Sequence, residues 1–296
     1  MRVAVSGSSG LLGSSLVPAL LREGHEVVRL VRRPAQGPDE RSWDPGAGRI
    51  DGPALSDVDA VVNFSGSRVW GTPWNKSSKQ ELVRSRVSST FTIVANLTRD
   101  GRCQRLLNAS AMNYYGDPGL EIVDEGSPMG DGFLAELTRD WENAARLSPV
   151  PCALMRTGQV LTENGGYLSR MKPLFNLYLG GRIGNGRQFL SWISLTDQVR
   201  ATMFLLKSAI TGPVNICSPF PVSNADFTRA IGAHLHRPTM VPLPVPVVEA
   251  ILGREYVDET ILHSVRARPA VLLGAGFEFR HPKLRAALAA IKQAAQ

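Results

Sequence analysis

The N-terminal segment restricts the fold of this chain more than any other stretch. Residues 2–6 (RVAVS) are an apolar run that predicts a buried strand, and residues 11–22 (LLGSSLVPALLR) have the spacing of an amphipathic helix. The glycine-rich turn GSSGLLG lies between them, and a second strand-like run, HEVVRLVRR, follows Gly24. The segment therefore predicts a β-α-β unit.

Strands and helices continue to alternate after this unit. Further strands are predicted at residues 59–66 (DAVVNFSG), 105–110 (RLLNAS) and 152–161 (CALMRTGQVL), with helices at residues 75–99 and 133–147. This alternation predicts an α/β fold with a Rossmann-like, doubly wound parallel sheet. Ligands of such sheets bind at the carboxyl ends of the strands.

The pattern becomes irregular beyond residue 163. Glycine-rich and proline-rich segments, among them LGGRIGNGRQ and RPTMVPLPVPVVEA, interrupt shorter elements there. We therefore expect a Rossmann domain at residues 1–163 and a smaller, mixed C-terminal substrate lobe at residues 164–296. Some C-terminal segments are expected to return to the main sheet.

The composition is that of a globular protein, with 43% hydrophobic and 20% charged residues among 296. The formal net charge of +7 fits non-specific binding of nucleic acid, a mixed surface rich in arginine, or a positively lined pocket for an anionic ligand. Because no long run of like charges occurs, we expect no specific nucleic-acid partner.

The cysteines and the N-terminus indicate the compartment. Cys103, Cys152 and Cys217 are scattered and odd in number, which argues against a disulfide framework and suits a reducing environment. The first apolar run is too short for a signal peptide, and no apolar stretch approaches the ~20 residues that span a membrane. We expect a cytoplasmic protein without a membrane partner.

The glycine-rich turn is the first candidate binding site. Glycines allow the backbone to approach a pyrophosphate, and the start of a helix supplies free N–H groups at its positive end. Because the turn follows a strand and opens a helix, it predicts cofactor binding, with an ordinary tight turn as the alternative. The residues concerned are Gly7, Ser8, Ser9, Gly10, Leu11 and Leu12.

The end of the second strand indicates which cofactor binds. Enzymes that use NAD usually carry Asp or Glu there for the ribose 2′-hydroxyl, whereas this chain has Arg32 and Arg33. Guanidinium groups suit a 2′-phosphate, so the pair favours NADP(H) over a solvated pair of arginines at a strand end. The next cofactor-side strand ends in Asn63-Phe64-Ser65-Gly66, where small residues would let the backbone run beneath a dinucleotide, with ordinary loop composition as the alternative.

Several motifs together resemble a known family. They are VSGSSGLLGSSL, DAVVNFSG, NASAMNYYGD, GFLAELTRDWE, RTGQVLTENGG, LGGRIGNGRQFLSWISLTD and AVLLGAGFEFRHPKLRAAL, and they extend from residue 5 to about residue 289. In them the chain is similar to extended and atypical short-chain dehydrogenase/reductases, and in particular to the epimerase family proteins with a C-terminal extension. The resemblance implies an NADP-binding Rossmann domain and a smaller C-terminal lobe, without a well-established substrate.

Positions that match the family's motifs imply cofactor contacts. Gly7 to Leu12 would contact the pyrophosphate, and Arg32 would contact the 2′-phosphate. Phe64 and Ser65 would lie along the cofactor. Contacts are also implied for Glu81 and Arg86, for which a solvated helix face with intrahelical pairing is the alternative. Val160 would pass the nicotinamide mainly through its backbone.

The usual catalytic residues of the wider superfamily are missing. Working members use a Ser or Thr and a Tyr-x-x-x-Lys pair on one helix, where the lysine lowers the pKa of the tyrosine. When Glu142 is aligned with the acidic residue that typically follows this motif, Leu134 stands at the position of the tyrosine and Thr138 at the position of the lysine. The serine position falls on Ala111, so neighbouring Ser110 either contacts nicotinamide or substrate, or caps the strand end.

Other residues are weaker candidates. Tyr115 matches a loop tyrosine of extended family members, and packing, substrate binding and acid–base work all stay open for it. Arg187 and Gln188 lie in a glycine-rich segment that either grips an anionic substrate or forms a surface turn. Asp197 is expected as a charge at the start of a late helix. The histidines have no metal-ligand spacing, so no metal is expected.

Two functions of different classes are compatible with these residues. The leading prediction is an NADP(H)-binding oxidoreductase or epimerase-like enzyme for an unknown small molecule, anionic or neutral, with an unconventional proton donor. The alternative is a non-catalytic NADP(H)-binding sensor or partner protein, which the missing Tyr and Lys favour. Catalytic residues stay unassigned, with Ser110 and Tyr115 as weak candidates.

Overall fold

The chain forms two compact units. The computed structural model describes residues 1–70, 74–163, 165–240 and 242–294. The first unit contains Met1–Ser110, Leu137–Arg156 and Val199–Val214, and the second contains Ala111–Glu136, Thr157–Gln198 and Asn215–Gln296. Each unit thus combines segments that are distant in sequence. The domain division at residues 163 and 164 stays a prediction, and Asn164 lies outside the described residues.

An eight-stranded sheet dominates the first unit, in the order β12-β8-β6-β5-β1-β2-β3-β4. The strands are β1 (Arg2–Ser6), β2 (Glu26–Val31), β3 (Glu40–Asp44), β4 (Arg49–Ile50), β5 (Ala60–Asn63), β6 (Leu106–Ala111), β8 (Cys152–Thr157) and β12 (Gly212–Ile216). β1 pairs in parallel with β2 and β5, β2 with β3, and β5 with β6, while β4 is antiparallel to β3. Because the chain builds outward from β1 first on one side and then on the other, the predicted Rossmann-like fold is confirmed.

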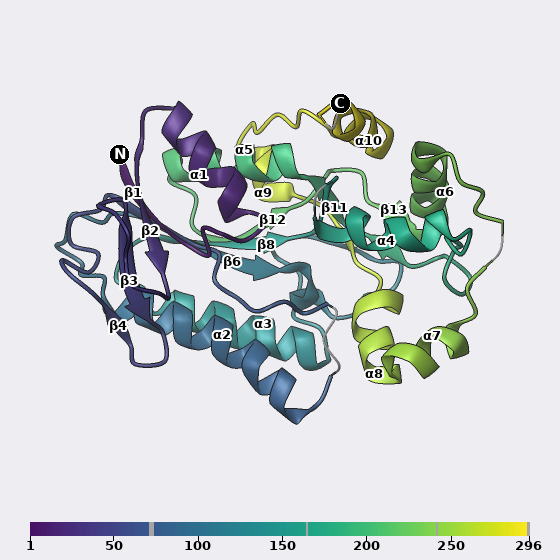
Figure 1. Cartoon of the computed structure of the whole chain (residues 1–296), viewed down its shortest axis with the longest axis horizontal. Coiled ribbons are helices and arrows are strands. Elements are labelled where there is room, and N and C mark those ends of the chain that lie inside the picture. The colour runs from purple at the N-terminus through teal and green to yellow at the C-terminus, as the bar shows by residue number, and fades with distance from the viewer. Residues whose placement is uncertain (71–73, 164, 241, 295–296) are drawn as a thin grey trace. The chain divides into compact units, whose positions relative to one another are not determined.

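Helices cover both faces of this sheet (Figure 1), with α1 and α5 on one face and α2 and α3 on the other. They are α1 (Gly13–Arg22), α2 (Lys76–Ala95), α3 (Phe133–Arg146) and α5 (Leu195–Lys207). Helix α1 buries Leu16 and Leu20, as its apolar spacing predicts. In the central strand β1, Val3 and Val5 have no exposed surface. The predicted core of the sheet is therefore present.

The segment at residues 152–161, expected as a strand that leaves into a loop, forms two strands. β8 belongs to the main sheet, whereas β9 (Gln159–Thr162) pairs in parallel with β11 (Trp192–Ser194). Gly158 separates them, and a Cβ on it would lie 2.5 Å from the carbonyl oxygen of Ser191. The break lies in Arg156-Thr157-Gly158-Gln159, where the apolar run of β8 has ended and that of β9 has not begun.

The second unit consists of shorter elements. Besides β9 and β11 it contains two strand pairs, β10 (Phe189–Leu190) with β13 (Val222–Ser223) and β7 (Ile122–Val123) with β14 (Arg266–Ala267). Its remaining elements are α4 (Gly166–Asn176), α6 (Asn224–Leu235), α7 (Val245–Leu252), α8 (Arg254–Val257), α9 (Ala270–Gly274), α10 (Leu284–Ala294), a 3-10 turn (Met112–Tyr115) and a π-helical turn (Asp258–Leu262). One core cluster packs Phe175, Trp192 and Phe227 against α10. Among the described helices, none is long and apolar enough to cross a membrane.

Candidate functional site

The turn after β1 has a backbone that only glycine accommodates. Gly7 has a φ of +63°, and a Cβ on it would lie 2.6 Å from the carbonyl oxygen of Phe64. The N–H of Gly10 donates to the carbonyl of Gly7 at 2.9 Å and closes the turn. The ends of β1 and β5 can therefore lie close together.

Helix α1 begins without a side-chain cap at Leu12. Within the described part of the chain, the backbone N–H groups of Ser8, Ser9, Leu11 and Leu12 have no hydrogen-bond acceptor. Unpaired N–H groups at a helix N-terminus carry a positive partial charge and attract anions. This end of α1 consequently has the chemistry to hold phosphate oxygens.

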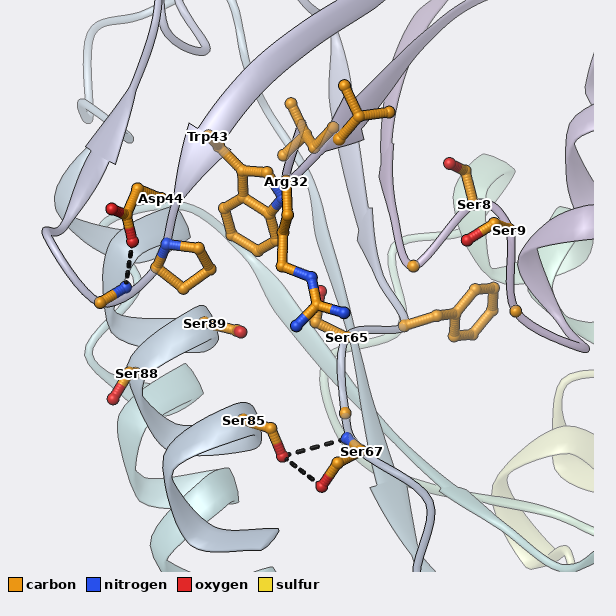
Figure 2. Close-up of a pocket in the computed structure, with 18 of the residues that line it drawn as sticks. Ser8, Ser9, Arg32, Trp43, Asp44, Ser65, Ser67, Ser85, Ser88 and Ser89 are labelled. Atoms are coloured by element: carbon orange, nitrogen blue, oxygen red, sulfur yellow. Dashed lines mark hydrogen bonds between the residues drawn. The ribbon is translucent and has the colours of Figure 1, made fainter. Parts of the chain in front are cut away.

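A cavity of about 890 Å³ opens beside this turn, a size typical of natural ligand sites. In Figure 2, Ser8 and Ser9 lie on one side of the cavity, and Ser85, Ser88 and Ser89 of α2 lie on the other. Most of the sequence-predicted cofactor residues line it, namely Gly7, Ser8, Ser9, Gly10, Arg32, Arg33, Phe64, Ser65, Gly66 and Glu81. The fold thus brings four separate predicted segments to one place.

The two arginines after β2 have different surroundings. Arg33 donates two hydrogen bonds of 2.7 Å to the carboxylate of Glu40, which lower the pKa of Glu40 to about 2. Arg29 approaches the same carboxylate at 3.1 Å. Arg32 has no side-chain partner among the described residues, and its guanidinium extends into the cavity toward Ser65 (Figure 2). Arg32 is therefore available to an anion, while Arg33 holds Glu40.

Helix α2 contributes two predicted residues in different ways. Glu81 lines the cavity and also pairs with Arg84 at 3.0 Å, so the intrahelical pairing is present and the cofactor contact stays a prediction. Arg86 donates to the carbonyl of Ser67 at 3.0 Å, and its guanidinium lies 5.2 Å from the ring centre of Trp141. Burial lowers the pKa of Arg86 to about 10. These contacts let Arg86 support the loop after β5.

A buried polar network lies under the carboxyl ends of β1, β5 and β6. Asn63 accepts a hydrogen bond from Ser6 at 2.6 Å and donates to Asn108 at 2.7 Å and to Thr90 at 3.0 Å. Trp141 also donates to Thr90, at 3.0 Å. Because buried networks with satisfied partners are rigid, this one fixes the strand ends from which the cavity loops leave.

Near the position expected for the catalytic residues, buried side chains form hydrogen bonds with one another. Ser110 donates to Glu142 Oε1 at 2.7 Å, and Arg156 holds the same carboxylate through Nε at 2.8 Å and Nη2 at 2.9 Å. Ser110 is 4% exposed, and Glu142 and Arg156 are each 1% exposed. This arrangement supports a structural role for Ser110 at the strand end. Leu134 and Thr138, at the Tyr and Lys positions, are also buried.

Two further predicted residues lie in the second unit. Tyr115 is 3% exposed and donates its hydroxyl to Oδ1 of Asn215 at 2.7 Å. It belongs to a buried cluster with Met112, which supports packing among the roles considered for it. Val160 lies in β9, opposite Ile193 of β11.

Asp197 and Gln188 of this unit also have structural partners. Asp197 is in the first turn of α5, as predicted, and its carboxylate accepts the backbone N–H groups of Arg280 and His281 at 2.8 Å each. Asp197 thereby anchors the C-terminal segment. Gln188 is buried and donates to the carbonyl of Ile183 at 3.4 Å.

Comparisons with known proteins identify the family. Residues 3–131 match the NAD dependent epimerase/dehydratase family, and residues 243–291 match a domain of unknown function, DUF1731. An epimerase family protein of Mycobacterium leprae is 46% identical over 290 residues, which cover 97% of this chain and 94% of that protein. This chain is an epimerase family protein.

Solved structures of similar proteins share the fold. The human epimerase family protein SDR39U1, crystallised with NADPH, has a TM-score of 0.89 and 32% identity, and the match covers 99% of both chains. A nucleoside-diphosphate sugar epimerase from Corynebacterium glutamicum has a TM-score of 0.81 and 34% identity over 98% of this chain and 57% of the other. Membership of the family supports a nicotinamide cofactor.

One wall of the cavity in this epimerase family protein has no clear signal in the sequence. The wall consists of Trp43, Asp44, Pro45 and Gly46, at and after the end of β3. β3 is hard to recognise because its sequence, ERSWD, is rich in charge, although Glu40, Arg41 and Trp43 are buried. A tryptophan followed by Asp-Pro-Gly is the signal that could have indicated a strand end followed by a turn.

Proposed function

We propose that this chain binds NADP(H) in the cavity of the first unit, with Arg32 holding the 2′-phosphate. The observation that carries the proposal is the guanidinium of Arg32, which extends into the cavity and has no partner among the described residues. The same cavity is lined by the turn before α1, where the N–H groups of Ser8 and Ser9 have no acceptor among the described residues, so it offers two separate groups for anions. The NADPH bound to human SDR39U1 supports the same cofactor here.

The residues of the cavity fit such a cofactor in two further respects. Gly7 and Gly10 keep side chains away from the turn that would carry the pyrophosphate. Glu40 also lines the cavity, but Arg33 and Arg29 offset its charge, so its repulsion of a 2′-phosphate is weakened. When bound, NADP(H) would supply hydride transfer at C4 of the nicotinamide. The chain's own residues would hold and orient it.

For the activity, we propose an oxidoreductase or epimerase-like enzyme that acts on a small molecule. Family membership supports this class, whereas Leu134 and Thr138 stand where the usual Tyr and Lys would be. The alternative is a non-catalytic NADP(H)-binding sensor or partner protein. It is favoured by the hydroxyls of Ser110 and Tyr115, because both already donate to buried partners.

Turnover assays separate these two functions. NADPH oxidation would be followed with a panel of carbonyl compounds. Because an epimerase returns the hydride to its substrate without net oxidation of the cofactor, nucleotide sugars would be incubated with NADP+ and analysed for altered sugars. Oxidation that depends on a carbonyl compound, or conversion of a nucleotide sugar, would support the enzyme and end the sensor proposal. Tight binding of NADPH without turnover across the panels would support the sensor.

Charge reversal at Arg32 tests the cofactor proposal. Calorimetric titration should show that the wild type binds NADPH more tightly than NADH. Arg32→Glu should weaken NADPH binding by about a hundredfold, because a charge-assisted bond is replaced by repulsion, and should change NADH binding by only a few-fold. Arg22→Glu on α1 makes the same charge change away from the cavity and should leave both affinities nearly unchanged. Tighter binding of NADH by the wild type would contradict the proposal.

A further inference from the structure

The second unit has a cavity of its own, about 370 Å³ in volume. Its lining residues come from four places in the sequence. They are Asp117, Gly119 and Leu120; Ile183, Gly184, Asn185, Arg187 and Gln188; Val245 at the start of α7; and Leu262 and Ser264 at and after the end of the π-helical turn. This volume lies within the range of small-molecule sites. An inference about this cavity goes beyond the proposed NADP(H) site and does not depend on it.

One wall is a glycine turn that carries Arg187. Gly184 and Gly186 have φ values of +59° and +70°, which favour glycine. The turn is anchored because Gly184 donates to the carbonyl of Leu243 at 3.1 Å, and Arg187 N–H donates to Asn185 Oδ1 at 2.9 Å. The side chain of Arg187 is exposed and has no partner among the described residues. A fixed backbone therefore presents an unpaired guanidinium.

Ser264 holds the facing segments together. Its hydroxyl accepts the N–H of Phe189 at 3.0 Å and donates to the carbonyl of Gly119. Its own N–H donates to Asp117 Oδ1 at 3.3 Å, and the N–H of Gly119 donates to the same oxygen at 3.0 Å. The carboxylate of Asp117 is thus already hydrogen-bonded, in contrast to the guanidinium of Arg187.

The lining defines the chemistry of a ligand. Among the described lining residues, Arg187 is the one cationic side chain. Apolar contact is available from Leu120, Ile183, Val245 and Leu262. Guanidinium groups bind carboxylate and phosphate oxygens by charge-assisted hydrogen bonds. A ligand that uses the whole cavity would therefore combine one anionic group with an apolar body.

We propose that this cavity binds a small organic anion, whose carboxylate or phosphate contacts Arg187 and whose apolar part packs against the leucine, isoleucine and valine side chains. All the residues that line this cavity belong to the second unit. Carboxylate and phosphate are distinguished by comparing two probes of similar size, benzoate and phenyl phosphate.

Calorimetry on the whole chain tests the proposal, with benzyl alcohol as the uncharged probe. At least one of the two anions should bind saturably and more tightly than benzyl alcohol. Arg187→Gln should weaken that binding by about ten- to a hundredfold, as expected for loss of a hydrogen bond to a charged group. Arg182→Gln is the matched control, because it removes the same charge from the same segment but does not line the cavity. It should change the affinity by less than about twofold.

Three outcomes would overturn the proposal. The first is failure of both anions to bind the wild type saturably. The second is equal weakening by Arg187→Gln and Arg182→Gln, which would indicate attraction by the general positive charge. The third is loss of probe binding in Arg32→Glu but not in Arg187→Gln, which would put the probe in the cavity of the first unit. Since NADP(H) titration is a separate measurement, failure of either proposal is recognisable on its own.

Discussion

Two places in the first unit combine arginine with a carboxylate, and they differ in what is left unpaired. At Glu142, the side chains of Arg156 and Ser110 are buried and bond to the carboxylate. At Glu40, Arg33 holds the carboxylate while Arg32 extends into the cavity without a partner among the described residues. The first arrangement uses its charges to hold the fold. The second keeps one charge available for a ligand.

Breaking the buried pair should have the largest effect. Arg156→Met leaves Glu142 buried, and its one remaining cationic partner among the described residues is Arg146, at 3.2 Å and half exposed. We expect the free energy of unfolding to fall by about 3–5 kcal/mol, the usual cost of an uncompensated buried charge. Urea unfolding at neutral pH measures this loss.

A double variant gives the control for this experiment. Glu142→Leu combined with Arg156→Met removes both buried charges, so much of the lost stability should return. If the single variant were as stable as the wild type, the cluster would not hold the fold, and its contrast with the Arg32 cavity would disappear.

Removing the hydroxyl of Ser110 should have a smaller effect. Ser110→Ala deletes one hydrogen bond to a carboxylate that keeps Arg156, so we expect a loss of about 1.5–3 kcal/mol in unfolding free energy. NADPH affinity should change by less than about threefold, in contrast to Arg32→Glu. Unchanged stability together with lost cofactor or substrate binding would show instead that Ser110 acts on a ligand.

The same contrast explains how far the sequence could predict the structure. β1, the turn at Gly7 and α1 were predictable because apolar spacing and glycine act over a few residues. The hydrogen bond between Ser110 and Glu142 joins residues that are 32 positions apart in the sequence. It therefore forms only when β6 and α3 pack against each other. No local pattern contains that information.

Arg32 and Arg33 show the limit within the candidate site. They are adjacent in sequence, and the pattern at the strand end does not distinguish them, although the resemblance to the family implies the phosphate contact for Arg32. Arg33 meets Glu40 because β2 and β3 pair in parallel, and β3 was not recognised in the sequence. That Arg33 pairs with Glu40 therefore depends on a tertiary contact, and the wall formed by Trp43 depends on the same strand.

The smallest expected effect is a pH dependence that tests this assignment of Arg33. Hydrogen bonds from Arg33 lower the pKa of Glu40 from 4.5 to about 2. Because the folded pKa is below the unfolded one, ionised Glu40 stabilises the fold above pH 4.5, and this contribution is lost as the pH falls toward about 2. The urea midpoint of the wild type should therefore exceed that of Glu40→Gln near neutral pH, by a small margin because Arg33 is exposed, and the difference should shrink over this interval. A difference that stays constant down to pH 2 would mean that Arg33 is not held by Glu40. Both arginines would then be available to the cavity.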